Sequence, residues 1–312
     1  MRIAVIGAGN WGKNLVKNLN NMGYLSGIVE INPQLRDSYS KEYPNTKIYP
    51  DLDSFIKEDF DAAVVATPAP YHFEIAEKIL LRGKDVLVEK PITLTSADAQ
   101  TLLNLATENN RVLMVNHLLM YQPAVQWIKK ALESKLIGKL YRIHQKRLAL
   151  GRARNIENVL WSLGVHDIAV SQFLIDSKPI KMKAHGQCVL NNNIEDDVYL
   201  HVEYENGVHS NLHCSWLWYE TNRGMVLIGS EGMLFYNEME QKVYLYKKTI
   251  DENLCNVDNG SELVYEGSGE PVKLMLEHFV HCINTNTTPI SDGNNALEVV
   301  KILEQAEKEL KQ

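Results

Sequence analysis

Three glycines near the start of the chain have the spacing of a loop that binds phosphate. Residues 7–12 read Gly-Ala-Gly-Asn-Trp-Gly, and they follow a short apolar run and precede a helical pattern. In this context the first glycine allows a tight turn, the second lets the backbone approach a pyrophosphate, and the third lets the helix pack closely on the strand. We expect a dinucleotide to bind here at the helix N-terminus. The expected contacts are Gly7, Gly9, Asn10, Trp11 and Gly12.

One carboxylate indicates which dinucleotide binds. Glu30 ends the second apolar run, about 20 residues after the loop, where a carboxylate can accept hydrogen bonds from the adenosine ribose hydroxyls. The next residue is Ile31 and the first arginine after it is Arg36, so the 2′-phosphate of NADP would meet a negative charge without a nearby cation. We therefore expect NAD. The alternative is a glycine turn that only joins a strand to a helix.

Three more candidate positions follow apolar runs that have the pattern of buried strands. Thr67-Pro68 follows the run 62–66, Glu89-Lys90-Pro91 lies at the end of 86–89, and His117 follows 112–115. The carboxyl ends of parallel strands meet at one edge of a sheet, where dinucleotides bind. An ordinary turn at Thr67, a surface Lys-Pro turn and a packing role for His117 stay open as alternatives. The further cofactor contacts expected are Thr67, Pro68, His72, Glu89 and Lys90.

A basic cluster lies near the middle of the chain. Lys146, Arg147, Arg152 and Arg154 fall within nine residues, just before a stretch that ends in His166-Asp167. Arginine can donate two parallel hydrogen bonds to a carboxylate or a diphosphate, so the cluster is a candidate site for an anionic substrate. A solvated loop is the alternative.

The composition excludes several classes of protein. The chain has 312 residues, with 39 acidic against 32 basic side chains and a net charge of -7, which argues against a nucleic-acid partner. A chain of this length is expected to form two domains. The sequence has no apolar run long enough for a membrane span and none that resembles a signal peptide. A cytoplasmic location is therefore expected. The four cysteines form no C-x-x-C pair, so we expect buried free thiols.

The hydrophobic pattern changes near residue 118. Before it, short apolar runs alternate with helical stretches, which predicts a doubly wound parallel sheet of the Rossmann type in a domain of residues 1–118. Beyond a helix around 123–134, most segments from 140 to 247 alternate with period two, which predicts a large, mostly antiparallel sheet in a second α/β domain, 119–312. The apolar stripe of a final helix, about 294–310, can pack in that domain or return to the first. The strands expected in the first domain are 3–6, 27–31, 62–66, 86–89 and 112–115.

One face of the second sheet is polar. The strands 197–204 and 208–215 place apolar residues on one side, while the other side carries polar residues and is a candidate subunit interface. His201, His209 and His213 lie on that polar side. No carboxylate or cysteine spacing accompanies them, so no metal site is expected.

Taken together, these motifs resemble the glucose-fructose oxidoreductase, inositol dehydrogenase and rhizopine catabolism (GFO/IDH/MocA) family of sugar oxidoreductases. The resemblance rests on the glycine loop, Thr67-Pro68, the Glu-Lys-Pro tripeptide at 89–91, the domain lengths and His166-Asp167, and it covers essentially the whole chain. It implies a Rossmann domain followed by an α/β domain with a large open sheet, whose outer face builds dimers or tetramers. It also implies that Lys90 sits beside the reacting carbon and that His166 exchanges the hydroxyl proton.

The chemistry of alcohol oxidation is consistent with both implied roles. A hydride leaves carbon while a proton leaves oxygen, so a group that titrates near neutrality helps at that oxygen, as histidine does. Lysine can stabilise the developing alkoxide, and it can share the proton relay if desolvation lowers its pKa.

Two departures from the common family pattern point to a particular branch. Many members have an aspartate four residues before the histidine, where this chain has Ser162. Many also carry Arg-aromatic-x-Pro where residues 120–123 read Met-Tyr-Gln-Pro. Polyol dehydrogenases are less expected for these reasons. The stretches 117–124 and 151–162 resemble instead the UDP-N-acetylglucosaminuronate 3-dehydrogenases of surface polysaccharide synthesis.

That branch implies oxidation at C3 of a UDP-linked sugar acid, with 2-oxoglutarate able to re-oxidise the NADH. The alternatives are an oxidoreductase for another sugar or polyol, such as a deoxysugar nucleotide or inositol, and a redox-silent NAD-binding protein. The residues then expected to contact substrate are Lys90, His117, Tyr121, Arg152, Arg154, Asn155, Asn158, Ser162 and His166.

Overall fold

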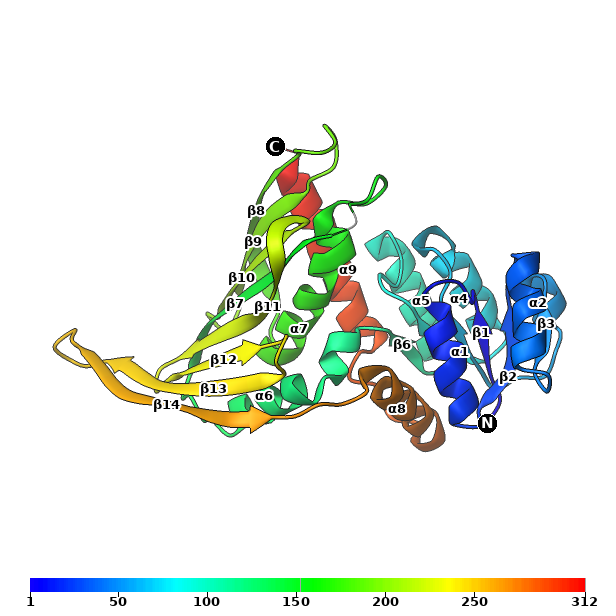
Figure 1. Ribbon diagram of the computed structural model, residues 1–312, viewed down its shortest axis with the longest axis horizontal. Coiled ribbons are helices and arrows are strands. Elements are labelled where there is room, and N and C mark those ends of the chain that lie inside the picture. Colours follow the sequence, from blue (N-terminus) through cyan, green and yellow to red (C-terminus); the bar gives the residue numbers. More distant parts are fainter. Residues whose placement is uncertain (152, 312) are drawn as a thin grey trace. The chain divides into compact units, whose positions relative to one another are not determined.

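The computed structural model describes residues 1–151 and 153–311 (Figure 1). The chain divides into two compact units. One comprises Met1–Leu118 with Glu270–Val300, and the other comprises Leu119–Gly269 with the residues from Lys301 onward. The first unit contains a parallel sheet and the second a mostly antiparallel one, which confirms the expected α/β fold.

The sheet of the first unit has six strands in the order β3-β2-β1-β4-β5-β6, all parallel. The strand order reverses between β1 and β4, which makes this pair the topological switch point where nucleotides bind in such folds. The predicted strands lie within two residues of the observed ones, and only the short β3 was not foreseen. The strands are β1 (Ile3–Ile6), β2 (Leu25–Val29), β3 (Lys47–Tyr49), β4 (Ala62–Val65), β5 (Asp85–Val88) and β6 (Leu113–Val115).

Side chains cap some of the helices in this unit. Asn32 caps α2 by accepting hydrogen bonds from two main-chain N–H groups, and Thr95 caps α5 by accepting one from the N–H of Asp98 at 3.1 Å. The helices are α1 (Gly12–Asn21), α2 (Pro33–Glu42), α3 (Leu52–Phe55), α4 (His72–Leu81), α5 (Ser96–Glu108) and α8 (Pro271–Thr285), with a short 3₁₀ turn η1 (Ala69–Tyr71).

The segment Glu270–Val300 completes the first unit from far along the chain. Helix α8 packs against α1. The main-chain N–H of Val115 donates to the carbonyl of Ser291 at 2.9 Å, and the Ser291 hydroxyl donates back to the carbonyl of Val115 at 2.7 Å. Helix α9 (Gly293–Leu310) starts in this unit, and its residues from Lys301 belong to the second.

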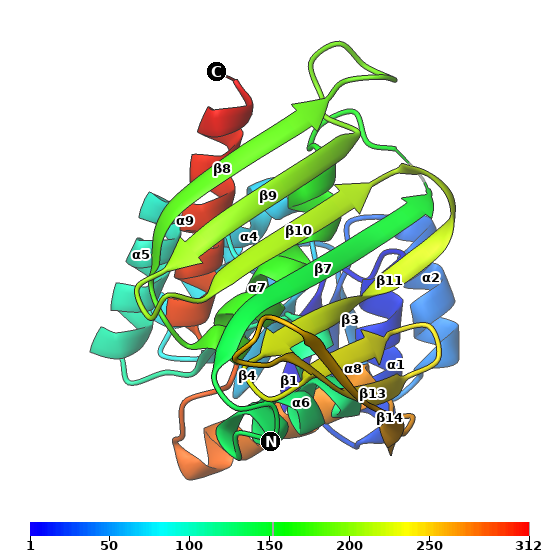
Figure 2. The same cartoon turned by 90° about the vertical axis from the view of Figure 1, so that its left-hand side faces the viewer.

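The second unit contains an open sheet of eight strands in the order β14-β13-β12-β11-β7-β10-β9-β8 (Figure 2). The central pair β7 and β10 is parallel and the other pairs are antiparallel. The strands are β7 (Leu140–Leu150), β8 (Pro179–Gln187), β9 (Asp197–Tyr204), β10 (His209–Ser215), β11 (Leu217–Gly229), β12 (Met233–Asn237), β13 (Lys242–Ile250) and β14 (Asn256–Glu266).

Helices cover one face of this sheet. These are α6 (Pro123–Glu133) and α7 (Val165–Ile175), with a π-helical turn, η3 (Leu160–Gly164), before α7 and a 3₁₀ turn, η2 (Leu118–Tyr121), before α6. In β9 the residues Val198, Leu200, Val202 and Tyr204 are buried and the alternate ones are not, as the period-two pattern predicted.

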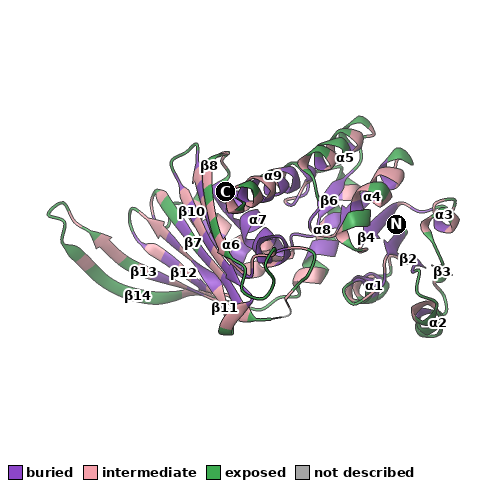
Figure 3. Cartoon of the chain, turned by 90° about the horizontal axis from the view of Figure 1, so that it is seen from above, coloured by how far each residue is buried: buried purple, intermediate pink, exposed green. Residues whose placement is uncertain are grey.

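Two parts of the second unit differ from the sequence expectation. The stretch 160–175 is helical, although it lies inside the region predicted to be mostly strand, and the sheet continues past residue 247 to Glu266. Helix α7 is buried on nearly every side, so it lacks the one-sided apolar period that marks a surface helix. Strand β14 is mostly exposed, which blurs its alternation (Figure 3). Within the described residues, no helix combines the length and apolarity that crossing a membrane would need.

Candidate active site

The three glycines of the loop serve different structural needs. Gly7 has φ +87°, and a Cβ there would lie 2.8 Å from the main-chain nitrogen of Thr67. A Cβ on Gly12 would lie 2.0 Å from the carbonyl oxygen of Gly7. A Cβ on Gly9 would meet nothing within 4 Å among the described residues. Gly7 and Gly12 are therefore required by the fold itself, while Gly9 leaves open space where a ligand can approach the backbone.

The loop is held by side chains from neighbouring elements. The Tyr39 hydroxyl donates to the carbonyl of Ala8 at 2.6 Å. The Glu30 carboxylate accepts from the N–H of Ala8 at 2.9 Å and from the N–H of Asn32 at 2.9 Å. Among the described residues, no side chain caps the first turn of α1. An uncapped helix start behind an open glycine and a fixed carboxylate fits the pyrophosphate and ribose of a dinucleotide.

The structure corrects one premise about the cofactor. Arg36 does lie near the end of β2, because α2 returns its guanidinium to donate to the carbonyls of Glu30 at 3.0 Å and Ile31 at 2.7 Å. The expectation that no cation lies near this position is wrong. The choice of NAD therefore rests on the Glu30 carboxylate rather than on the absence of an arginine.

Glu89 joins three strand ends of the first unit. Its carboxylate accepts hydrogen bonds from the Trp11 indole in the glycine loop and from the Asn116 side chain just after β6. Burial raises the pKa of Glu89 to about 7, and these hydrogen bonds oppose the rise. The carboxyl therefore titrates close to neutrality. Lys90 follows it, and the Lys90–Pro91 peptide is cis.

His72 connects two of the predicted turns. Its Nδ1 lies 2.7 Å from the carbonyl oxygen of Pro91 and its Nε2 lies 2.8 Å from that of Thr67. Burial lowers the pKa of His72 in spite of these two contacts. Because both ring nitrogens contact the main chain, His72 positions the turns and does not present a nitrogen to a ligand. The Thr67 hydroxyl is buried without a partner among the described residues, as expected of a group that a cofactor would satisfy.

His117 is a neutral imidazole in the first unit. It is 1% exposed, and neither ring nitrogen has a hydrogen-bond partner among the described residues. Burial and the positive charge of Lys90 lower the pKa of His117 to about 3. A buried imidazole with two unsatisfied nitrogens is costly unless a ligand meets one of them. The neighbouring Asn116 was missed, although it also follows the end of an apolar run.

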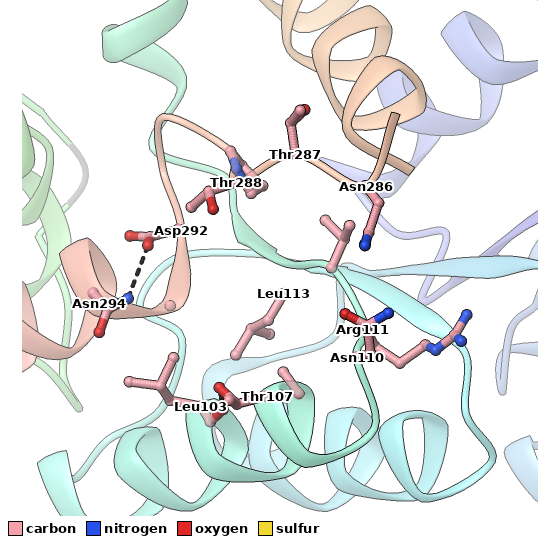
Figure 4. Close-up of a pocket in the computed structure, with 14 residues that line it drawn as sticks. Leu103, Thr107, Asn110, Arg111, Leu113, Asn286, Thr287, Thr288, Asp292 and Asn294 are labelled. Carbon is pink, nitrogen blue, oxygen red and sulfur yellow. Dashed lines mark hydrogen bonds between the residues drawn. The ribbon is translucent and has the colours of Figure 1, made fainter. Parts of the chain in front are cut away.

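A separate cavity of about 250 Å³ lies at the amino end of β6, in the parallel sheet of the first unit (Figure 4). Arg111, Val112 and Leu113 line it at the amino end of β6, whereas His117 follows the carboxyl end. Residues 286–289 and 292–294 line its other side, where Asn294 donates to Asp292 at 2.9 Å. This cavity is therefore distinct from the predicted cofactor positions.

The predicted basic cluster is not one surface. Arg147 is 4% exposed, and its guanidinium donates to Asp167 at 2.5 and 3.1 Å and to Glu238 at 2.7 and 3.1 Å. It is neutralised inside the second unit and cannot clamp a substrate. Lys146 points to the opposite face of the sheet because side chains alternate along β7. The expectation that these two residues bind the anion together is wrong.

The other residues predicted to bind substrate in this stretch also differ in burial. Arg152 lies outside the described residues. The Arg154 side chain is about half exposed, and its Nε lies 3.6 Å from a carboxylate oxygen of Glu157. Asn155 is exposed. Asn158 is buried and caps the helical turn that follows, since its oxygen accepts from the N–H groups of Leu160 and Trp161 and its nitrogen donates to Glu195.

His166 stands in the first turn of α7 and is partly buried. The next residue, Asp167, forms the ion pair with Arg147 that ties this helix start to β7. Ser162 is buried in the π-helical turn, and Tyr121 is buried at the end of η2. The Arg147–Asp167–Glu238 network was not foreseen. The adjacent His and Asp were its only sequence signal.

Comparison with known proteins identifies both parts of the chain. Residues 1–117 match the oxidoreductase family described as having an NAD-binding Rossmann fold, and residues 125–235 match the GFO/IDH/MocA C-terminal domain. UDP-N-acetylglucosamine 3-dehydrogenase of Acidithiobacillus ferrooxidans is 25% identical over 249 residues, which cover 80% of this chain and 77% of that protein. Its solved structure superposes with a TM-score of 0.89 at 23% identity, covering 100% of this chain and 97% of that one.

A second relative is named for a different activity. The NAD-linked scyllo-inositol 2-dehydrogenase of Bacillus subtilis is 21% identical over 305 residues, which cover 93% of this chain and 88% of that protein. These matches confirm the expected dehydrogenase and its cofactor, NAD.

Proposed function

Because the chain belongs to the GFO/IDH/MocA family of NAD-binding oxidoreductases, we propose that it oxidises a secondary alcohol of a nucleotide-linked sugar. The proposed substrate is UDP-N-acetylglucosaminuronate, oxidised at C3 to the 3-keto sugar for surface polysaccharide synthesis. The observation that carries the substrate class is the similarity to UDP-N-acetylglucosamine 3-dehydrogenase along 80% of the chain. That the sugar is the acid rather than the neutral N-acetylglucosamine is the more specific part of the proposal.

The proposed chemistry separates the two hydrogens of the alcohol. Bound NAD supplies the hydride acceptor. His166 takes the hydroxyl proton as general base, and Lys90 donates a hydrogen bond to the same oxygen as its charge develops. These two residues belong to different units, so their assignment rests on the family resemblance and on the surroundings of each.

The surroundings of Lys90 support an electrostatic role. His117 is held neutral, so it competes with Lys90 neither for a proton nor for an anionic oxygen at working pH. We assign a lone-pair or N–H contact with a sugar hydroxyl to His117. Glu89 holds the strand end on which Lys90 stands.

Substrate recognition is proposed for a smaller set than the sequence suggested. Arg154 and Asn155 are exposed, and they are proposed to bind a carboxylate or diphosphate. Arg152, which lies outside the described residues, keeps the role that the sequence predicts for it. Asn158 and Ser162 are proposed to shape the helix start beside His166, and Tyr121 to shape the segment after β6. His72 keeps a positioning role for the turns at Thr67-Pro68 and Lys90-Pro91.

The test is turnover on a matched pair of substrates. Purified protein is mixed with NAD and either UDP-N-acetylglucosaminuronate or UDP-N-acetylglucosamine, with and without 2-oxoglutarate, and the keto sugar is measured by mass spectrometry. We expect the acid to react faster. Lys90→Met and His166→Asn should each lower kcat at least about a hundredfold, while Lys146→Met is the control. Protein that binds both NAD and the acid yet forms no keto sugar would overturn the proposal.

Arg154→Ala separates the acid from the neutral sugar. If Arg154 binds the carboxylate, this change raises KM for the acid roughly tenfold and leaves KM for UDP-N-acetylglucosamine unchanged. An equal effect on the two substrates would place Arg154 on the diphosphate instead.

Inositol oxidation is the second candidate, because scyllo-inositol 2-dehydrogenase matches 93% of the chain. Turnover of free inositols without any nucleotide sugar would favour it. We also propose a cytoplasmic location, since all four cysteines are free thiols as in reducing compartments. Cys214 and Cys282 are buried, whereas Cys188 and Cys255 are exposed, so the expectation that all four are buried is wrong. A dimer or tetramer through the open sheet stays a prediction, which analytical ultracentrifugation would test.

A further inference from the structure

The outer face of the second sheet brings together residues that are not neighbours in the sequence. Across the antiparallel pair β9 and β10, His201 lies directly opposite Asn211 and Glu203 directly opposite His209. The alternate residues of β9, Val198, Leu200 and Val202, are buried, so these four side chains project to the other face. Figure 2 shows β8, β9, β10 and β7 side by side across this face.

Three donor atoms meet at this position, and one belongs to the carboxylate of Glu203. The expectation that no carboxylate accompanies these histidines is therefore wrong. The Nε2 of His201 lies 3.3 Å from the Nδ1 of His209 and 3.8 Å from a carboxylate oxygen of Glu203, and the donor atoms of all three residues lie within 4.8 Å of one another. Around a tetrahedral zinc ion with bonds of about 2.0–2.2 Å, donor atoms are about 3.3–3.6 Å apart. The cluster is therefore close to the required spacing before any ion binds.

The hydrogen bonds around His201 direct its free lone pair toward the cluster. The Nδ1 of His201 lies 2.8 Å from the side-chain oxygen of Asn211, and the Asn211 nitrogen lies 3.4 Å from the Nδ1 of His144. An amide oxygen only accepts, so Nδ1 carries the hydrogen and Nε2 carries the lone pair. A second ring nitrogen held by a carbonyl is the usual arrangement of a metal-binding histidine.

We propose that His201, His209 and Glu203 form a site for Zn²⁺ or a similar transition-metal ion, with Asn211 as its positioning residue. Two imidazoles and one carboxylate suit these borderline ions rather than Mg²⁺ or Ca²⁺. In the single chain the side chains of His201 and Glu203 are 33% and 29% exposed, so an ion can enter and water can complete the coordination. In an oligomer that forms through the open sheet, as proposed above, the site would lie at the subunit interface. For Nδ1 of His209 to coordinate the ion, the hydrogen of the neutral ring must lie on Nε2.

Lys181 would compete with a metal ion for the Glu203 carboxylate. Its ammonium lies 3.3 Å from the same Glu203 oxygen, on a side chain that is 64% exposed. A metal ion must displace this lysine from the carboxylate. The site therefore has a variant with a predicted gain: Lys181→Met should bind the ion more tightly, by about three- to fivefold.

The experiment uses the full chain, free of tags and stripped with a chelator. Co²⁺ is titrated while visible absorption is followed, and Zn²⁺ affinity is measured by competition with a chromophoric chelator. We expect one ion per chain, with the intense absorption bands of four-coordinate Co²⁺. His201→Gln and His209→Gln should each weaken binding at least about a hundredfold, and Asn211→Ala about tenfold. Zn²⁺ should raise the thermal midpoint of the wild type and not that of His201→Gln.

His185→Gln is the matched control, because His185 lies on the same face, opposite Tyr199, and outside the cluster. It should bind the ion as the wild type does. Each variant must retain NADH binding, which reports that the chain is folded, and Glu203→Gln provides a further variant if a histidine change fails this check. Wild-type protein that binds no ion, or binding that survives both His201→Gln and His209→Gln, overturns the proposal.

Discussion

The Glu89 carboxyl gives the predicted cofactor region a group that titrates near neutral pH. Its pKa rises from 4.5 to about 7 in the folded chain, chiefly because burial disfavours the charge. The folded state therefore binds this proton more tightly than the unfolded state. From this group alone, stability decreases as pH rises from about 4.5 to about 7 and stays lower above that range.

Glu89→Gln should remove this pH dependence, because the amide keeps an acceptor oxygen for Trp11 and Asn116 without a charge. We expect the variant to gain stability over the wild type between pH 5 and pH 8, on the order of 2 to 3 kcal/mol at most. Urea unfolding of the NAD-free protein at a series of pH values measures this difference. Parallel curves for the two proteins would contradict the assignment.

Glu30 is expected to set the preference for NAD. Glu30→Gln keeps an acceptor for the N–H of Ala8 and removes the charge that repels a 2′-phosphate, while Arg36 stays at the end of β2. The ratio of NADP to NAD efficiency should rise roughly tenfold or more, which corresponds to about 1.4 kcal/mol of repulsion removed. Steady-state kinetics with both cofactors measures it. Adding Arg36→Ala should reduce the gain only in part, because the repulsion by Glu30 stays removed while the nearby cation is lost. An unchanged NADP to NAD ratio in Glu30→Gln would contradict the role of Glu30.

Within the glycine loop, Gly12 is required for folding, whereas Gly9 is expected to be required only for cofactor binding. Gly12→Ala places a Cβ against the Gly7 carbonyl, so it should lower the thermal midpoint as well as NAD affinity. The Cβ of Gly9→Ala would meet nothing within 4 Å among the described residues beyond its chain neighbours, so this variant should keep the midpoint and weaken NAD binding alone, by about tenfold or more. Calorimetric unfolding and NADH fluorescence titration distinguish the two effects. Equal loss of stability in both variants would contradict this division.

The start of α7 depends on a buried charge network. Arg147→Met should cost about 3 to 5 kcal/mol, because it leaves the Asp167 carboxylate buried without its ion-pair partner and Glu238 with only Arg223, at 4.0 Å. Lys146→Met, one residue away on the other face, should change stability by less than about 0.5 kcal/mol. Chemical denaturation of the two variants gives the comparison. A small effect for Arg147→Met would mean that water or another cation reaches these carboxylates.

On the scale of the whole molecule, the cofactor unit is assembled from two separate parts of the sequence. We predict that residues 1–118 alone unfold at lower temperature and bind NADH more weakly than the same fragment joined to 270–300 by a flexible linker. The missing segment supplies α8 against α1 and the Ser291 hydrogen bonds at β6. Circular dichroism and NADH titration of the two fragments test it. Equal behaviour would show that the contiguous fragment is sufficient.

Much of the fold is predictable from the sequence because its signals are local. A strand that is buried on both faces is a continuous apolar run, and a strand that is covered on one face alternates between apolar and polar residues. The hydrophobic pattern therefore predicts both sheets. The loop at Gly7–Gly12, Glu30 and the tripeptide at 89–91 are also short-range patterns whose chemistry follows from residue type. Family, fold class and cofactor followed from these signals and agree with the matched relatives.

The pairing of side chains from distant segments was decided only by the tertiary structure. Arg36 returns to the end of β2 because α2 turns back, and Arg147 is neutralised because β7 faces α7. Glu203 meets His209 because the register of β9 and β10 places them opposite one another. The sequence determined the type and period of each element, whereas register and helix packing determined which charges are neutralised, because charge pairing depends on distance in space and not on separation along the chain.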